Sequence, residues 1–265
     1  MPKLAIALMF SLAFSSLGTA FATPGAWKAL GKAGDWARTK FAAADGGSLY
    51  TIENDGSFYV TDVATGAWRK VGKSDYARTK RLWAGSGKVV TLETDGSLYV
   101  IEPGDGSWKR LGKAGDWART TFGAILDGAL YTVEDGGKLY VTDLASGAWK
   151  ELGKGDYGHT KFAAATGGKL FTIERDGNLY AINPDGSWAR MGKAGDYKNT
   201  RMLTAGDGVL FTLEPGGHLY ATDAATAKWI ELGKADFDRT KFMAATAGKL
   251  FTIENDGTLY VIDVK

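Results

Sequence analysis

The chain repeats a pattern of short apolar runs separated by glycine-containing turns. Four such runs open the repeating part, at residues 27–30, 40–44, 48–53 and 57–62. The turns Gly-Gly, Asn-Asp-Gly and Ala-Thr-Gly that accompany them favour the positive φ angles of tight hairpins. Residues 49–52 are apolar on both faces of a pleated strand, so a sheet built from these runs must be covered on both sides. The pattern therefore predicts small antiparallel sheets stacked against one another.

Six tryptophans recur along the chain at successive spacings of 41, 40, 41, 39 and 41 residues. A unit of about 40 residues with four strands is the length of one propeller blade. The spacing predicts an all-β fold, a six-bladed β-propeller with four antiparallel strands in each blade. We also expect the recurring tryptophans to lie in the core: Trp27, Trp68, Trp108, Trp149, Trp188 and Trp229.

The order of the runs predicts how the ring closes. The repeating part begins with a tryptophan strand and ends after a third-strand run at residues 259–263. We therefore expect residues 27–30 to form the outermost strand of a blade whose other three strands lie in residues 241–263. An open solenoid is the alternative, and it would need capping units at its ends that the sequence lacks.

Residues 1–22 have the pattern of a secretory signal peptide, and we assign residues 23–265 to the propeller. Lys3 supplies a positive start, residues 4–14 an apolar run, and Ala20-Phe21-Ala22 a small-residue cleavage site before Thr23. The apolar run is shorter than the roughly 20 residues that cross a bilayer. These features predict a secreted or periplasmic protein that does not insert into a membrane.

The composition narrows the chemistry. The chain has no cysteine, and its 32 basic residues nearly balance 30 acidic ones. These features exclude thiolate chemistry and give no electrostatic reason to expect nucleic acid as a partner. His159 and His218 fall at different places in different units, and no Ser-His-Asp or metal-ligand pattern accompanies them. We therefore expect no enzyme activity and no bound metal or cofactor. We also expect the protein to be a monomer.

The link between each tryptophan strand and the next inner strand repeats the same residue types. It carries a lysine, an aspartate followed by an aromatic residue, and a threonine, and a glutamate ends each second strand. These loops and the turns after the glutamates should project from the same face of the ring, so we expect them to converge there. The candidate ligand-binding residues are the aspartate and aromatic pairs: Asp35, Trp36, Asp75, Tyr76, Asp116, Trp117, Asp156, Tyr157, Asp196, Tyr197, Asp236 and Phe237.

An architectural interpretation of these columns stands beside the functional one. The lysines, threonines and glutamates can satisfy backbone groups and one another. The loop aromatic can wedge between neighbouring blades without touching a ligand. The sequence leaves both roles open for the aspartate and aromatic pairs.

Residues 30–52, with Gly-Lys, a loop glycine and aromatic, Lys-Phe and Gly-Gly-x-Leu-Tyr, resemble the repeat of the tectonin-type β-propeller lectins, the group of tachylectin-2. These features return in all six units with gaps, such as Thr121 for the lysine and Val89-Val90 for Leu-Tyr. The resemblance implies equivalent, metal-independent sites between blades that bind amino sugars such as N-acetylglucosamine. Tachylectin-2 itself has five longer repeats, so the shape of the pockets can differ.

The recurring residues suit a sugar, because a pyranose offers hydroxyls to an acceptor such as Asp35 and an apolar face to a ring such as Trp36. Weak sites repeated on one face gain avidity on a glycan-coated surface. The sequence thus predicts a multivalent lectin. A protein-interaction scaffold without sugar binding is the alternative, and it would use one asymmetric patch such as Lys80, Arg81 and Trp83.

Overall fold

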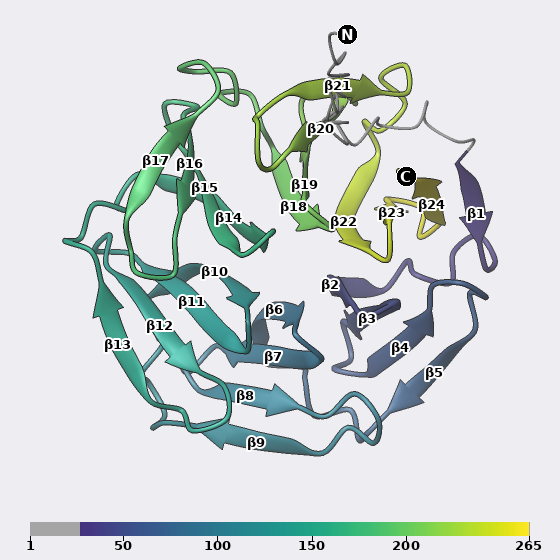
Figure 1. The fold of residues 1–265 in the computed structure, drawn as a ribbon. Helices are drawn as coiled ribbons and strands as arrows, with labels where there is room; N and C mark the ends of the chain where they lie inside the picture. Colours follow the sequence, from purple (N-terminus) through teal and green to yellow (C-terminus); the bar gives the residue numbers. More distant parts are fainter. Residues whose placement is uncertain (1–26, 265) are drawn as a thin grey trace, which may run out of the picture.

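The computed structural model describes residues 27–264, which form a closed ring of six sheets around a central axis (Figure 1). Each sheet has four antiparallel strands, and no helix occurs in this part of the chain. The prediction of an all-β, six-bladed propeller is confirmed.

The strands fall into four concentric sets. The innermost are β2 (Thr39–Asp45), β6 (Thr79–Gly85), β10 (Thr120–Leu126), β14 (Thr160–Thr166), β18 (Met202–Gly206) and β22 (Thr240–Thr246). The second strands are β3 (Ser48–Glu53), β7 (Lys88–Glu93), β11 (Ala129–Glu134), β15 (Lys169–Glu174), β19 (Val209–Leu213) and β23 (Lys249–Glu254). The third strands are β4 (Phe58–Asp62), β8 (Leu98–Ile101), β12 (Leu139–Asp143), β16 (Leu179–Ile182), β20 (Leu219–Asp223) and β24 (Leu259–Asp263). The outermost are β5 (Trp68–Val71), β9 (Trp108–Leu111), β13 (Trp149–Leu152), β17 (Trp188–Met191), β21 (Trp229–Leu232) and β1 (Lys28–Leu30).

Blades 1 to 5 are each continuous in sequence, from β2–β5 to β18–β21, and blade 6 combines the two ends of the chain. In blade 6, β1 pairs with β24 in the register Lys28 to Val261, Ala29 to Tyr260 and Leu30 to Leu259. The two strands lie side by side in Figure 1. The predicted closure by the N-terminal strand is therefore confirmed.

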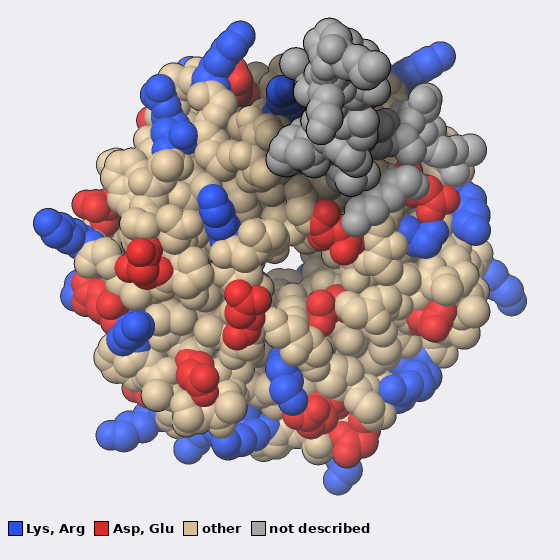
Figure 2. All heavy atoms as spheres, in the orientation of Figure 1, with Lys and Arg blue, Asp and Glu red and all other residues tan. Residues whose placement is uncertain are grey.

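The core consists of the layers between neighbouring blades. Between blades 1 and 2, for example, Ile52 and Phe58 pack with Leu82, Val89 and Ile101. Each sheet is covered on both faces, as the doubly apolar strands require. The inner strands leave a central channel of about 280 Å³, which opens in the middle of the face shown in Figure 2. Acidic and basic side chains are interspersed over that face.

The prediction that the six recurring tryptophans are core residues is wrong. Their side chains are between 49% and 57% exposed. Each lies on or directly beside an outermost strand, where neighbouring blades have diverged too far from each other to cover it. The fully buried aromatic residues belong instead to the second and third strands: Phe58, Phe171, Phe211 and Phe251.

The predicted signal peptide, residues 1–22, lies outside the described residues. Within residues 27–264, no helix is long and apolar enough to cross a membrane.

Candidate functional site

The link loops meet the turns between second and third strands, as the topology predicts. In every blade the backbone N–H of the loop aromatic donates to a turn glycine of the preceding blade, at 3.0 to 3.2 Å. The contact from Trp36 to Gly257 closes the ring, and that from Tyr157 to Gly137 joins blades 3 and 4. These bonds hold each link loop between two blades.

The candidate aspartates and aromatics have opposite exposures. All six loop aspartates are exposed. The loop aromatics are only 4% to 6% exposed: Trp36, Tyr76, Trp117, Tyr157, Tyr197 and Phe237. Trp36 packs against Leu30, Phe251 and Leu259 of blade 6. The loop aromatic is thus a wedge between blades, and only part of its ring borders the space outside the core.

A second set of aromatics provides the accessible ring faces. Each exposed tryptophan packs at 78° to 90° against a half-buried tyrosine of the adjacent third strand, with ring centroids 4.8 to 5.4 Å apart. In blade 4 the pair is Tyr180 and Trp188, with centroids 5.2 Å apart. Two ring planes at a right angle form an aromatic corner.

These groups come together in pockets between neighbouring blades. Four pockets of the same construction lie beside blades 1 to 4, with volumes of about 40, 170, 80 and 390 Å³. Each is lined by the loop aspartate and aromatic, a second-strand threonine and glutamate, and the tyrosine and tryptophan of the aromatic corner. We number each pocket by its blade. Eight of the twelve predicted site residues line these pockets: Asp35, Trp36, Asp75, Tyr76, Asp116, Trp117, Asp156 and Tyr157.

In blades 2, 4 and 6 the glutamate that ends the second strand is anchored by the threonine that begins the inner strand. Thr79 donates to Glu93 at 2.9 Å, Thr160 to Glu174 at 2.9 Å and Thr240 to Glu254 at 2.8 Å. Burial raises the pKa of all three carboxyl groups, and the threonine hydroxyl partly opposes this rise. One oxygen of each of these carboxylates is therefore held in place by a structural bond, which supports an architectural role for these three threonines. The hydroxyls of Thr39, Thr120 and Thr200 have no such partner.

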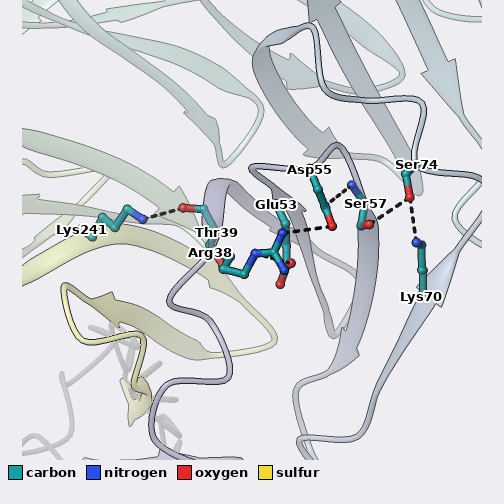
Figure 3. A network of polar contacts seen from close by, with 8 residues as sticks. All are labelled: Arg38, Thr39, Glu53, Asp55, Ser57, Lys70, Ser74 and Lys241. Atoms are coloured by element: carbon teal, nitrogen blue, oxygen red, sulfur yellow. Dashed lines mark hydrogen bonds and ion pairs between the residues drawn. The ribbon is translucent and has the colours of Figure 1, made fainter.

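An arginine from the link loop crosses toward the turn in four units. Figure 3 shows it in unit 1, where Arg38 lies beside Glu53 and pairs with Asp55 at 3.3 Å. The equivalent pairs are Arg78 with Asp95, Arg119 with Asp135, and Arg239 with Asp256. These surface pairs add little stability. Arg78 and Asp95 also line pocket 2.

Of the two histidines and the alternative patch that the sequence singled out, only His159 lies at one of these four pockets. His218 contacts Glu231 at 2.6 Å on the surface, whereas His159 lines pocket 4. Arg81 donates to the carbonyl of Thr121, and both Arg81 and Trp83 line the central channel, so they do not form an outward patch. In residues 27–264, no cluster of three or more His, Asp or Glu residues could hold a metal ion.

The aromatic corner was not predicted from the sequence, because large apolar side chains at regular spacing favour core positions. The sequence nevertheless contains a pattern that indicates it. Trp188 and its counterparts begin short strands at the outer end of each sheet, and a third-strand tyrosine recurs in every unit. In an ordered antiparallel sheet those two positions become neighbours across the outer strand pair.

No family model and no curated protein matches this sequence. Solved structures similar to it share 11% to 17% identity. They include a Bacteroides thetaiotaomicron protein of unknown function (TM-score 0.65, 12% identity, 90% of this chain and 76% of that one). Another is virginiamycin B lyase from Staphylococcus aureus (TM-score 0.57, 11% identity, 89% and 88%).

A third similar structure is PorZ, a bacterial surface component of the type IX secretion system of Porphyromonas gingivalis. Its TM-score is 0.52 at 15% identity, and the match covers 89% of this chain and 34% of PorZ. This chain thus spans about a third of PorZ. At these identities the likeness shows the propeller fold alone.

Proposed function

We propose that this protein is an exported, multivalent, non-enzymatic carbohydrate-binding protein whose sites are the pockets between blades. The observation that carries the proposal is the repeated combination of an exposed aromatic corner with carboxylate and hydroxyl groups. The resemblance of the repeat to tectonin-type lectins and the signal-like residues 1–22 support it from the sequence. Amino sugars such as N-acetylglucosamine on surface glycans are the proposed ligands.

The pocket chemistry suits a pyranose ring. The C–H face of a sugar packs on an aromatic ring, and each exposed tryptophan offers about half of its surface. The adjacent glutamate and loop aspartate accept hydrogen bonds from sugar hydroxyls, with charge-assisted strength. The stacking ring in this mechanism is the outer tryptophan, with the buried loop aromatic as the inner wall of the pocket.

Repetition compensates for shallow sites. A site of this size binds a monosaccharide at about millimolar affinity, near 4 kcal/mol. When several sites of one ring contact the same glycan-coated surface, avidity rises by about 10²- to 10⁴-fold. The closed ring holds the blades, and therefore the pockets between them, at fixed positions in one molecule. Avidity requires this fixed arrangement of several sites.

A glycan array with the full mature protein tests the proposal. We expect binding to amino-sugar glycans, and loss of most of that binding in the fourfold variant Trp68→Ala, Trp108→Ala, Trp149→Ala and Trp188→Ala. The control variant carries Arg69→Ala, Lys109→Ala and Lys150→Ala, which follow three of those tryptophans on the same strands and are exposed. A silent array with a folded parent protein, or equal binding by the two variants, contradicts the proposal.

A further inference from the structure

Pocket 4 differs from its counterparts in size. Its volume of about 390 Å³ compares with about 40, 170 and 80 Å³ beside blades 1, 2 and 3. The volume of pocket 4 is more than twice that of pocket 2 and several times those of pockets 1 and 3. The two smaller pockets have a tryptophan as loop aromatic, Trp36 or Trp117, and the two larger ones a tyrosine, Tyr76 or Tyr157. Further substitutions distinguish pocket 4 from pocket 2.

The first substitution removes the arginine at the rim. His159 occupies the position that Arg38, Arg78 and Arg119 occupy in the other three pockets. The shorter imidazole does not bridge to the turn, and in residues 27–264 no ion pair joins Asp176 as Arg38 joins Asp55. Asp176 instead accepts hydrogen bonds from Asn178, and it remains exposed on the pocket wall.

The second difference frees the loop aspartate. In units 1 and 3 the loop is one residue longer, and the aspartate accepts a bond from the lysine backbone N–H, at 3.0 Å for Asp35 and 2.8 Å for Asp116. The shorter loop of unit 6 also keeps such a bond, from Lys234 to Asp236 at 3.3 Å, but in the described part of the chain none holds Asp75 of unit 2 or Asp156 of unit 4. The carboxylate of Asp156 is exposed and available to a ligand.

The third difference is a set of buried polar atoms without partners. Glu174 is 9% exposed and uses Oε1 for Thr160, while Oε2 has no hydrogen bond. The hydroxyl group of Tyr157 also has none, whereas an unpaired threonine hydroxyl occurs in all four pockets, at Thr61, Thr91, Thr142 and Thr172. In blade 5, Tyr197 reaches Thr222, but the residue of blade 4 at that position is Ile182. Buried polar atoms without partners are costly, so a bound polar ligand gains by satisfying them.

The charges at this pocket indicate what that ligand carries. Asp156, Glu174 and Asp176 line this pocket with two basic side chains, Arg175 and His159, so the carboxyl groups outnumber the basic groups. Beside them lie the rings of Tyr180 and Trp188, with Trp188 51% exposed. Net negative charge next to aromatic faces attracts a cation, both by ion pairing and through the ring quadrupole.

We propose that pocket 4 is the primary binding site of the ring and that it takes a hexosamine with a free, protonated amino group in preference to the N-acetylated sugar. The inference rests on the proposed carbohydrate-binding function and specifies its ligand. The ammonium group lies between the carboxylates of Asp156 and Glu174, and the sugar ring packs on Trp188. An N-acetyl group has no charge to pair with these carboxylates.

Calorimetric titration of the full mature protein tests this with glucosamine, N-acetylglucosamine and glucose at about pH 6, where an aliphatic amine is protonated. We expect one dominant site, with glucosamine binding at least about tenfold more tightly than the other two sugars. That ratio corresponds to about 1.4 kcal/mol. Equal or tighter binding of N-acetylglucosamine overturns the inference and leaves the lectin proposal standing. Absence of binding to any sugar here and on the array overturns both.

Two exchanged variants locate the site. His159→Arg introduces the residue type of units 1, 2 and 3, and we expect it to weaken glucosamine binding by about tenfold or more with an unchanged melting temperature. Arg78→His removes the rim arginine of pocket 2, where Asp75 also lacks the loop bond in the described chain, and should raise the number of tight sites above one. If His159→Arg leaves the affinity unchanged and Arg78→His adds no site, pocket 4 is not the primary site.

Discussion

At the scale of single residues, the recurring tryptophans have exchanged the core position that the sequence predicts for an exposed one, while the loop aromatics take the wedge role that the sequence left open beside a ligand contact. The loop aromatics, such as Trp36, are buried wedges, and the recurring tryptophans, such as Trp188, are half exposed. Residue type alone did not distinguish them, since both are large aromatic groups at regular spacing. Their burial depends on distance from the ring axis: the loop ring lies between two blades, while the outer tryptophan lies where the blades separate.

The exchange predicts a difference in stability between two truncations in blade 4. Phe171→Ala removes a ring that is 1% exposed and should lower the free energy of unfolding by about 3 to 5 kcal/mol. Trp188→Ala removes a half-exposed ring and one aromatic pair, so we expect about 1 to 2 kcal/mol. Urea denaturation of both variants measures the difference. Equal losses would show that the outer tryptophans contribute as core residues after all.

The buried glutamates predict a pH dependence. Burial raises the pKa of Glu254, so the folded protein binds more protons than the unfolded chain between the ordinary and the raised pKa. The contribution of Glu254 to stability is therefore most favourable at a pH below the ordinary pKa of a glutamate. It becomes less favourable as the pH rises through the raised pKa of the folded state. Glu254→Gln keeps an acceptor for Thr240 and removes the charge. We expect this variant to be more stable than the parent at pH 7.

The advantage of Glu254→Gln should shrink as the pH falls to about 4, near the ordinary pKa of a glutamate. Glu254→Ala serves as control, because it deprives the Thr240 hydroxyl of its acceptor at every pH and should destabilise throughout. Denaturation at both pH values measures the two effects. A Gln variant with the same stability offset at pH 7 and pH 4 would contradict the assignment of the pKa shift to burial.

At the scale of strands and turns, the sequence predicted the fold closely. The runs at 40–44 and 48–53 became Thr39–Asp45 and Ser48–Glu53, because glycines at positive φ end the strands where the pattern breaks. The convergence of loop and turn also followed from strand order. What the sequence did not predict is the different size of equivalent pockets, since that depends on how far the side chains of separate segments fill the space between them.

Two turn glycines of blade 2 differ in how much space surrounds them, and they form a matched pair for substitution. Gly96 has φ +79° and a Cβ there would lie 2.6 Å from the backbone nitrogen of Ala118. Gly87 has φ +72° with no atom within 4 Å of its Cβ position. Gly87→Ala should cost only the left-handed strain, about 1 to 2 kcal/mol. Gly96→Ala should cost about 3 kcal/mol, because the link loop must also move. Similar losses in urea denaturation would show that the contact between turn and link loop is unimportant.

At the scale of the whole molecule, the ring depends on one short strand from the start of the chain. β1 covers the edge of β24, and Leu30 is buried with Phe251 and Val261. Trp27 also packs on Tyr260, with centroids 4.8 Å apart. In each of the other five blades, all four strands are consecutive in the sequence. The stability of the last blade, and through it the spacing of the pockets, therefore depends on contacts between the two ends.

Two truncated chains test this dependence. Deletion of residues 1–26 leaves every contact within residues 27–264 in place, whereas deletion of residues 1–30 also removes β1 and the ring of Trp27. We expect the longer deletion to lower the free energy of unfolding by about 3 kcal/mol relative to the shorter one, mostly from the lost burial of Leu30 and its neighbours. It also exposes the edge of β24, which favours association between copies. Chemical denaturation and light scattering measure both effects. Equal stability and equal solubility of the two truncated chains would mean that a ring with a three-stranded last blade is sufficient, and that the pairing of β1 with β24 does not hold the propeller closed.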